Sequence, residues 1–335
     1  MDLLMKMFSR SGRGLAGILP LVLLLSGVFP AQGYAPALLL GLYGQEIFTD
    51  DQGSQTAVRA SGLLSWRTSL AENASLALYA GSVMDRTVLD GGWLYDAHSL
   101  SLDLLLRGQG GRFALEGGVN GSFQGTLSGQ DPYVRPDWRV GYEHDLDDAL
   151  TSIAYSGYYL YQPEASEDAL FQAMSVAVAK NPSIRFRYGF ELLGGWERWT
   201  EEDRDDFLGS LEASAGGLIG FFHDWSVAAE GGIRLSEDGS ESNLFLDVDG
   251  DWAWSPHRQV SLELGIFLRQ EIYYRAGGLP DVPRAFSTGM ELRGDWTPND
   301  RLYLVAELSA SRRFATDPAD SWWNVLARAG LELSF

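Results

Sequence analysis

The chain ends on the stretch WNVLARAGLELSF, residues 323–335, in which apolar and polar residues alternate up to a terminal aromatic. One face collects Trp323, Val325, Ala327, Ala329, Leu331, Leu333 and Phe335, and the other is dominated by Asn324, Arg328, Gly330, Glu332 and Ser334. This period of two predicts a β-strand with one apolar face and one wet face. A soluble β-sandwich could also end in this way, so the rest of the chain has to decide the fold class.

The same stretch resembles the terminal strand of Gram-negative outer-membrane β-barrels. In those proteins the C-terminal Phe and the alternating apolar residues before it are read by the barrel-assembly machinery. The resemblance implies that Phe335 is a barrel-assembly signal and that the protein is delivered to the outer membrane. It also implies that the last strand closes the barrel, by pairing with the strand near Leu38–Tyr43.

The N-terminus has the layout of a secretory signal peptide. Lys6, Arg10 and Arg13 precede the apolar run Leu15–Phe29, and Ala31-Gln32-Gly33 places small residues where a signal peptidase cleaves. The run is shorter than the roughly 20 apolar residues of a membrane-spanning helix. We therefore expect residues 1–33 to be a signal peptide and residues 34–335 to be the exported protein.

The composition limits the classes of function. The chain carries 25 Lys plus Arg and 45 Asp plus Glu, a net charge of −20. Residues 1–33 contain three basic residues and one acid, so their removal would bring the charge to −22. Such an acidic chain is a poor partner for nucleic acid, which calls for basic patches. The absence of cysteine excludes thiol catalysis, thiolate metal sites and disulfides.

Clusters of Gly, Pro, Asn and Asp divide residues 34–335 into alternating runs, without any domain boundary. Seven short turn signals lie at 71–74, 108–111, 145–148, 181–183, 222–224, 255–258 and 298–300. Eight longer polar segments lie at about 50–54, 86–95, 125–134, 162–167, 201–205, 236–241, 275–283 and 315–321. Together they connect sixteen strands, with both termini on the side of the short turns. Because the runs at 37–48 and 169–180 alternate less cleanly, fourteen or twelve strands remain open.

Aromatic residues at the strand ends favour a membrane barrel over a sandwich. Trp66, Trp225, Trp252, Trp254 and Trp296 lie near the short turns, and Tyr159, Tyr161, Trp196, Phe286 and Trp323 lie near the longer loops. By parity, each shares a face with the aliphatic residues of its strand, which is the arrangement of aromatic girdles at the two lipid–water boundaries. The predicted fold class is therefore all-β, a transmembrane antiparallel up-and-down β-barrel of sixteen strands.

Charged residues collect on the face opposite the aliphatic one, and we expect this face to line the barrel. The predicted pore-lining residues are Arg59, Arg67, Asp103, Arg107, Glu116, Arg139, Arg185, Arg187, Glu191, Glu212, Glu230, Arg234, Asp247, Asp249, Asp251, Glu263, Arg269, Glu291, Arg293, Glu307, Arg328 and Glu332. So many charges are tolerated most simply by water in the lumen, and a barrel of sixteen strands is wide enough to hold it.

The leading functional interpretation is a porin-like channel for passive diffusion of small hydrophilic solutes, with an acidic excess that favours cations. One alternative is a non-conducting barrel subunit of a cell-envelope, secretion or motility complex, whose inward charges only pair between strands. Another is a channel for a larger polymer or a hydrophobic compound. None of the loops exceeds about a dozen residues, so the lumen is either open or narrowed by side chains such as Phe267, Tyr273 and Tyr303.

No enzyme, metal site or cofactor is predicted. The stretch Asp247–Asp251 has acids at alternate positions, but its Gly250 is fourth and Arg258 is twelfth, which does not fit a calcium loop. His98 lies near Asp96 and could pair with it, while the acidic run Glu201–Asp206 and Asp85 are expected in solvated outer loops. The expected partners are outer-membrane lipid, the barrel-assembly machinery and small hydrophilic solutes, with no nucleic acid.

Overall fold

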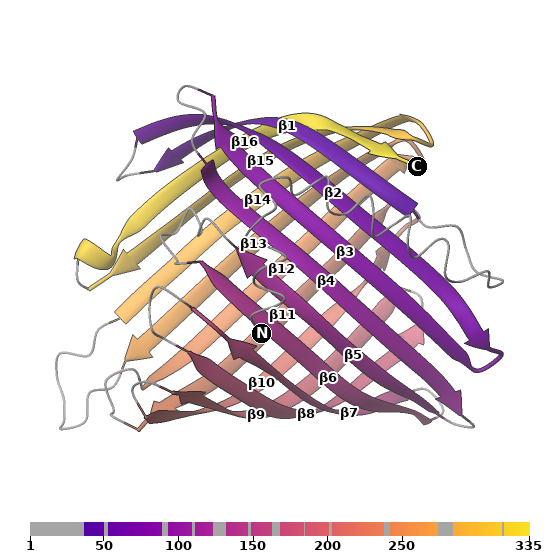
Figure 1. Ribbon diagram of the computed structural model, residues 1–335, viewed down its shortest axis with the longest axis vertical. Coiled ribbons are helices and arrows are strands. Elements are labelled where there is room, and N and C mark those ends of the chain that lie inside the picture. The colour runs from indigo at the N-terminus through magenta and orange to yellow at the C-terminus, as the bar shows by residue number, and fades with distance from the viewer. Residues whose placement is uncertain are drawn as a thin grey trace, which may run out of the picture.

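The computed structural model describes residues 37–49, 53–88, 93–108, 111–122, 132–146, 149–162, 168–183, 185–200, 203–237, 242–273, 284–316 and 318–335. They form one closed antiparallel barrel of sixteen strands (Figure 1). The strands are β1 (Ala37–Thr49), β2 (Gly53–Ala71), β3 (Ala74–Thr87), β4 (Trp93–Gly108), β5 (Gly111–Ser122), β6 (Tyr133–Leu146), β7 (Ala149–Leu160), β8 (Ala169–Ser183), β9 (Phe186–Trp199), β10 (Arg204–Ile219), β11 (His223–Ser236), β12 (Asn243–His257), β13 (Val260–Tyr273), β14 (Arg284–Asn299), β15 (Leu302–Ala315) and β16 (Trp322–Ser334), with one 3-10 turn, η1 (Pro318–Asp320), before β16. The predicted fold class and the count of sixteen are confirmed.

The barrel closes where the first strand meets the last. β1 pairs with β16 from Leu39 opposite Ser334 to Thr49 opposite Asn324. Beyond this ladder the backbone of Phe335 exchanges two hydrogen bonds with Leu38, at 2.8 and 3.1 Å. The predicted pairing of the terminal strand with residues 38–43 is therefore correct. The predicted signal peptide, by contrast, lies outside the described residues.

Hydrogen bonds between strands two positions apart show which face is inside. Tyr158 on β7 donates to Glu197 on β9, Gln45 on β1 donates to Asp85 on β3, and Arg313 on β15 pairs with Glu271 on β13. Side chains converge on the concave face of a barrel and diverge on the convex one, so contacts that skip a strand belong inside. All of these residues lie on the polar face of their strands, which is therefore the lining of the barrel.

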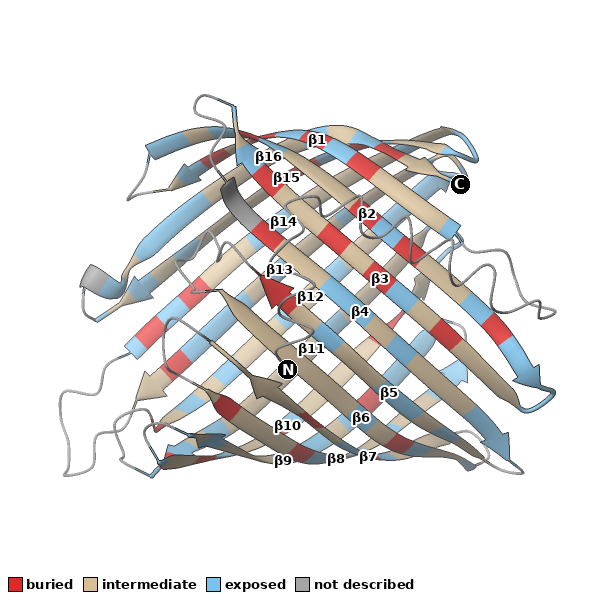
Figure 2. Cartoon of the chain, viewed as in Figure 1, coloured by how far each residue is buried: buried red, intermediate tan, exposed pale blue. Residues whose placement is uncertain are grey.

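The opposite face is aliphatic and aromatic and looks outward. Large exposed side chains on it include Leu102, Leu192, Leu211, Ile266 and Leu308, which are 47–60% exposed. The few buried residues are scattered along the strands and do not form one central core (Figure 2). This exposed apolar band is what hydrocarbon contact requires, and the predicted girdle tryptophans share its face at the strand ends. Among the described residues, no helix is long and apolar enough to cross a membrane.

Three of the predicted short turns lie slightly too early in the chain. The pairing register shifts between Lys180 and Ser183, between Trp254 and His257, and between Trp296 and Asn299. Each shift encloses a proline, which cannot donate to the ladder and is tolerated at β-bulges and strand ends. These prolines therefore lie in bulges at the ends of β8, β12 and β14, and the chain reverses only after them.

Two predicted loop assignments are wrong. β3 continues to Thr87, so Asp85 belongs to a strand, and it is fully buried. β10 begins at Arg204, so the last three residues of the acidic run Glu201–Asp206 belong to a strand, and Asp206 is 2% exposed. Both carboxylates accept hydrogen bonds from arginines, which is why acids with loop-like neighbours are found inside the wall.

Candidate functional site

The structure places the predicted pore-lining residues on the inner face, with one exception. Arg185 lies in the turn between β8 and β9, where it is exposed. The others follow the inner face of their strands by register, including Arg59, Arg67, Asp103, Arg107, Glu116, Arg139, Arg187, Glu191, Glu212, Glu230, Arg234, Asp247, Asp249, Asp251, Glu263, Arg269, Glu291, Arg293, Glu307, Arg328 and Glu332. Their contacts divide the wall into two chemically different regions.

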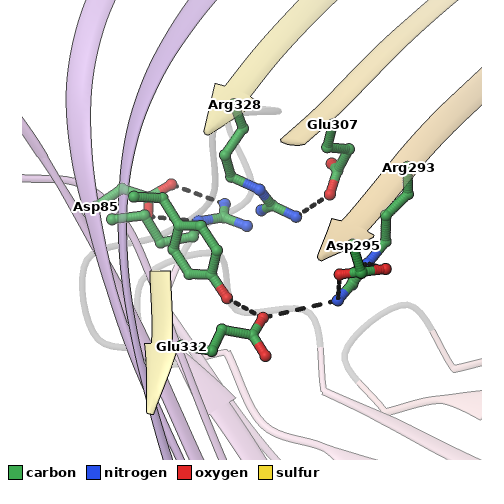
Figure 3. A network of polar contacts seen from close by, with 8 residues as sticks. Asp85, Arg293, Asp295, Glu307, Arg328 and Glu332 are labelled. Carbon is green, nitrogen blue, oxygen red and sulfur yellow. Dashed lines mark hydrogen bonds and ion pairs between the residues drawn. The ribbon is translucent and has the colours of Figure 1, made fainter. Parts of the chain in front are cut away.

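The first region surrounds the seam between β1 and β16, and we call it the closure network (Figure 3). It consists of Tyr43, Gln45, Arg59, Asp85, Arg293, Asp295, Glu307, Arg328 and Glu332, which come from the six adjacent strands β14, β15, β16, β1, β2 and β3. Across the seam itself, the hydroxyl of Tyr43 donates to Glu332, and the Arg328 guanidinium lies over the Tyr43 ring at 5.1 Å. The closing strands are thus joined by side chains as well as by backbone.

Each carboxylate of the closure network has a cationic or amide partner. Asp85 accepts from Arg59 Nε at 2.8 Å, from Arg59 Nη2 at 2.8 Å and from Gln45 Nε2 at 2.9 Å. Arg328 donates to Glu307. Arg293 donates to Asp295 at 3.0–3.2 Å and lies 3.7 Å from Glu332. Bidentate and charge-assisted bonds of this kind are the strong ones, and in this part of the wall three arginines offset most of the charge of four carboxylates.

Glycines let the aromatic rings of the inner face lie flat against the wall. A Cβ at Gly330 would meet the Tyr43 ring at 2.4 Å and the carbonyl oxygen of Leu42 at 2.3 Å. The same relation joins Gly289 to the Phe267 ring at 2.2 Å and Gly232 to the Phe245 ring at 2.4 Å. Phe267, one of the side chains expected to narrow an otherwise open lumen, therefore packs along the strand next to it.

The second region is a row of carboxylates on four adjacent strands, and we call it the acidic row. Glu191 on β9 lies directly opposite Glu212 on β10, which lies opposite Glu230 on β11, which lies opposite Asp247 on β12. The row ends at Arg269 on β13, whose Nε is 3.4 Å from Asp247. Like charges in directly opposed positions destabilise a sheet, so this pattern is costly for folding.

Asp249 and Asp251 extend the acidic surface along β12. They share the inner face with Asp247, as the sequence analysis predicts, and their cross-strand partners on β11 are the uncharged Ala228 and Ser226. Ser226 lies 3.3 Å from Asp251 and is its hydrogen-bond donor. In the described part of the chain, no group of three or more acidic or histidine side chains is arranged to hold a metal ion.

A further set of paired side chains lies toward the outer ends of β7 and of β9, β10 and β11, three of the strands that carry the acidic row. Tyr158 donates to Glu197 at 2.7 Å, and Arg234 donates to Glu197 at 2.7 Å and to Asp206 at 2.8 Å. Of these residues, only Arg234 was expected in the lining. Parity would have placed Tyr158 and Glu197 inside as well, but both lie close to predicted loops.

The predicted proximity of His98 and Asp96 is confirmed. His98 Nε2 lies 3.1 Å from Asp96, and His98 Nδ1 lies 3.0 Å from the Ser82 hydroxyl. Asp96 also accepts from Ser122 at 2.7 Å, and both Ser82 and Asp96 are 4% exposed. The buried Ser82, Asp96 and Ser122 and the partly exposed His98 form a polar chain that ties β3, β4 and β5 together. His144 and His223, in contrast, stack on Tyr142 and on Trp252 and Trp254 near the short turns.

The comparisons with known proteins address the fold. No protein-family model and no curated protein matches the chain. Among solved structures it is similar to in-vitro folded OmpT, an outer membrane protein of Vibrio cholerae, at 12% identity and TM-score 0.51, over 92% of this chain and 100% of that one. A loop L8 deletion mutant of OmpT gives 12% identity and TM-score 0.51 over 90% of this chain and 100% of that one. Pseudomonas aeruginosa OccK9 gives 11% identity and TM-score 0.49 over 90% and 98%.

Likenesses at such low identity concern the fold alone. The closed barrel with its outward apolar band has the fold of outer-membrane β-barrels such as OmpT.

Proposed function

We propose that the protein is an outer-membrane channel for the passive diffusion of small hydrophilic solutes, with a preference for cations. The observation that carries this proposal is the acidic row, in which Glu191, Glu212 and Glu230 have no ion pair with any described residue. Charges that serve only to hold strands together would be paired, as they are in the closure network. An unpaired row that opposes folding is better explained by its field in the lumen.

Two further features support an aqueous lumen. Unpaired carboxylates in a dry interior would cost several kcal/mol each, whereas water removes most of that cost. The rings of Tyr43, Phe245 and Phe267 lie over glycines of neighbouring strands and so leave the space in front of the wall to solvent. A barrel of sixteen strands is in the size range that leaves an aqueous channel.

Planar-bilayer recording of the refolded protein tests this proposal. Folding is first confirmed by heat-modifiable migration, and single insertions should then give unitary conductance steps in KCl. A folded protein that gives no steps would overturn the channel and favour the alternative, a non-conducting barrel subunit of an envelope complex. Passage of a large polymer but not of small ions would favour the other alternative, a channel for a larger polymer.

The export route is part of the same proposal. We infer that residues 1–33 are removed and that Phe335 directs assembly of residues 34–335 into the outer membrane. The backbone hydrogen bonds of Phe335 to Leu38, and its 64% exposure on the outward face, suit a residue at the lipid-facing rim of the closing strand. N-terminal sequencing of protein recovered from outer membranes should begin at Tyr34. A Phe335→Ala variant should accumulate in the periplasm. Normal insertion of this variant into the outer membrane would contradict the assembly role of Phe335.

A further inference from the structure

A pocket of about 300 Å³ opens on the inner face of β1 to β6, away from the acidic row. Its polar lining includes Ser61, Ser99, Asn120, Tyr133 and Arg135, each on the inner face of its strand by register. The volume lies at the lower end of the range for small-molecule sites. It suits a solute of about six carbon atoms that each bear an oxygen, which is the size of a sugar.

Arg135 is the unusual member of this lining. It makes no ion pair with any described residue, and its Nε atom is buried without a hydrogen-bond partner. Its guanidinium lies over the Tyr158 ring, 5.3 Å from the ring centroid. The nearest acid on its own strand, Asp137, accepts from Asn120 instead. A fixed guanidinium with unused donors is complementary to a carboxylate or a phosphate, which it can bind through two parallel hydrogen bonds.

No carboxylate is among the described residues that line the pocket. His98 borders it, but both ring nitrogens are engaged, one with Ser82 and one with Asp96. The remaining polar groups are hydroxyls and an amide, which can donate to and accept from the hydroxyls of a polyol. Leu63 and Val83 add apolar surface of the kind that packs against its carbon chain.

The position of the pocket explains how an anion could be held in an acidic lumen. In a closed barrel of sixteen strands, strands eight positions apart lie on opposite sides, so β9 to β12 face β1 to β4 across the lumen. The part of the pocket on β1 to β4 therefore lies on the wall opposite the acidic row. Arg135 itself lies on β6, three strands from β9 where the row begins, and water in the lumen screens the repulsion between the row and a bound anion.

We propose that this pocket is a binding subsite for a small polyhydroxylated anion, a sugar-like chain bearing one carboxylate or phosphate, with Arg135 holding the acid group. The proposal deepens the channel function above, because it names a solute class that the lumen would retain in transit. Binding itself does not depend on conduction, so the two can fail separately.

Isothermal titration of the refolded, detergent-solubilised protein tests the subsite with three probes of one chain length. Gluconate carries a carboxylate, sorbitol 6-phosphate carries a phosphate, and sorbitol carries neither. We expect at least one of the anions to bind, and sorbitol to bind about tenfold more weakly or not at all, which is the effect of losing a charged hydrogen-bond partner. Whichever anion binds identifies the acid group.

Arg135→Gln should weaken binding of that anion by about tenfold or more. Arg139→Gln is the matched control, because Arg139 lies on the same face of β6, carries the same charge and does not line the pocket. Each variant is first shown to fold by heat-modifiable migration. If Arg135→Gln does not fold, Ser99→Leu, which fills the pocket from β4, replaces it.

Three results would overturn the subsite: no binding of either anion, sorbitol binding as tightly as gluconate, or equal losses in Arg135→Gln and Arg139→Gln. Arg135-dependent binding by a protein that gives no conductance would remove the channel proposal and leave the subsite standing. Conductance without binding of either anion would remove the subsite and leave the channel proposal standing.

Discussion

The closure network and the acidic row occupy the same inner face, but they treat charge in opposite ways. Around the seam, Asp85, Glu307 and Glu332 are each bound by an arginine, an amide or a hydroxyl, and each is at most 9% exposed. In the acidic row on β9 to β12, carboxylates face carboxylates, and among the described residues only Asp247, the last of the row, has an arginine as its partner. The comparison separates charges that serve the barrel's stability from charges whose use lies in the lumen.

The difference also indicates which strand pairing in the barrel is the most costly to form. The seam joins the two ends of the chain, about 290 residues apart in sequence, so its pairing has the highest cost in chain entropy. The strands of the acidic row are joined by short connections and are held by continuous backbone ladders. Side-chain pairs reinforce the seam, and the repulsive row lies where neighbouring strands find each other most easily. Four substitutions would break or sharpen this contrast.

The largest expected effect is from Asp85→Ala in the closure network. The change leaves the half-buried Arg59 and the buried Gln45 without the carboxylate that they share, and breaking such a pair costs about 3 kcal/mol. Urea titration of refolded protein, read by gel migration, measures the loss. The control is Asp103→Ala. Asp103 also lies on the inner face, on the neighbouring strand β4, but it makes no ion pair with a described residue, so its loss should change stability little. Equal losses in both variants would contradict the contrast.

Gly330→Ala should have the next largest effect. A Cβ there would lie 2.3 Å from the Leu42 carbonyl oxygen and 2.4 Å from the Tyr43 ring, so the seam would have to shift. Overpacking of this kind costs about 1–3 kcal/mol. Gly44→Ala on the adjacent strand is the control, because nothing lies within 4 Å of its added Cβ. The yield of heat-modifiable barrel after refolding should fall for Gly330→Ala alone.

Tyr43→Phe separates the hydrogen bond at the seam from the ring. The variant keeps the ring against Gly330 but loses the donor to Glu332, at a cost of about 1 kcal/mol. The same urea titration should show a small loss, well below that of Asp85→Ala. A loss as large as that of Gly330→Ala would mean that the hydroxyl, and not the flat ring, determines closure.

The smallest expected effect is a gain in stability, whereas the three changes above cause a loss. Glu212 has an acid directly opposite on each side, Glu191 and Glu230, so Glu212→Gln removes two repulsive contacts. The variant should be more stable by a few tenths of a kcal/mol, up to about 1, at neutral pH and low salt. The gain should shrink as salt screens the row. Destabilisation at low salt would show that the row is held by partners that support folding.

Much of this arrangement could be predicted from the sequence. Alternation in runs such as Val260–Leu268 fixed which residues look inward, and the turn signals gave the number of strands. The inner positions of Asp247, Asp249 and Asp251 followed from their period of two. Register could not be predicted, because the alternation says which face a residue takes but not which residue lies opposite it. The acidic row depends on that register, so the sequence indicated an acidic lining without its one-sided distribution.

Three members of the closure network, Tyr43, Gln45 and Asp85, were missed for a different reason. Tyr43 and Gln45 lie in a run where both faces carry apolar residues, and Asp85 precedes a segment with the composition of a loop. Composition predicts a loop where acids cluster, but in the wall the buried Asp85 is offset by Arg59, which comes from another strand. Pro182, Pro256 and Pro298 also led to loop assignments where the chain is still in a strand, because a β-bulge and a turn have similar local sequences.

The central claim is that the acidic row sets the field of an open lumen, and the reversal potential in a KCl gradient tests it most directly. The wild-type channel should be cation-selective, and a variant with Glu191→Gln, Glu212→Gln, Glu230→Gln and Asp247→Asn should lose most of that preference. The control variant, Asp103→Asn with Glu116→Gln, removes inner-face acids on β4 and β5 and should lose less. An anion-selective wild type, or a preference unchanged by neutralising the row, would contradict the account.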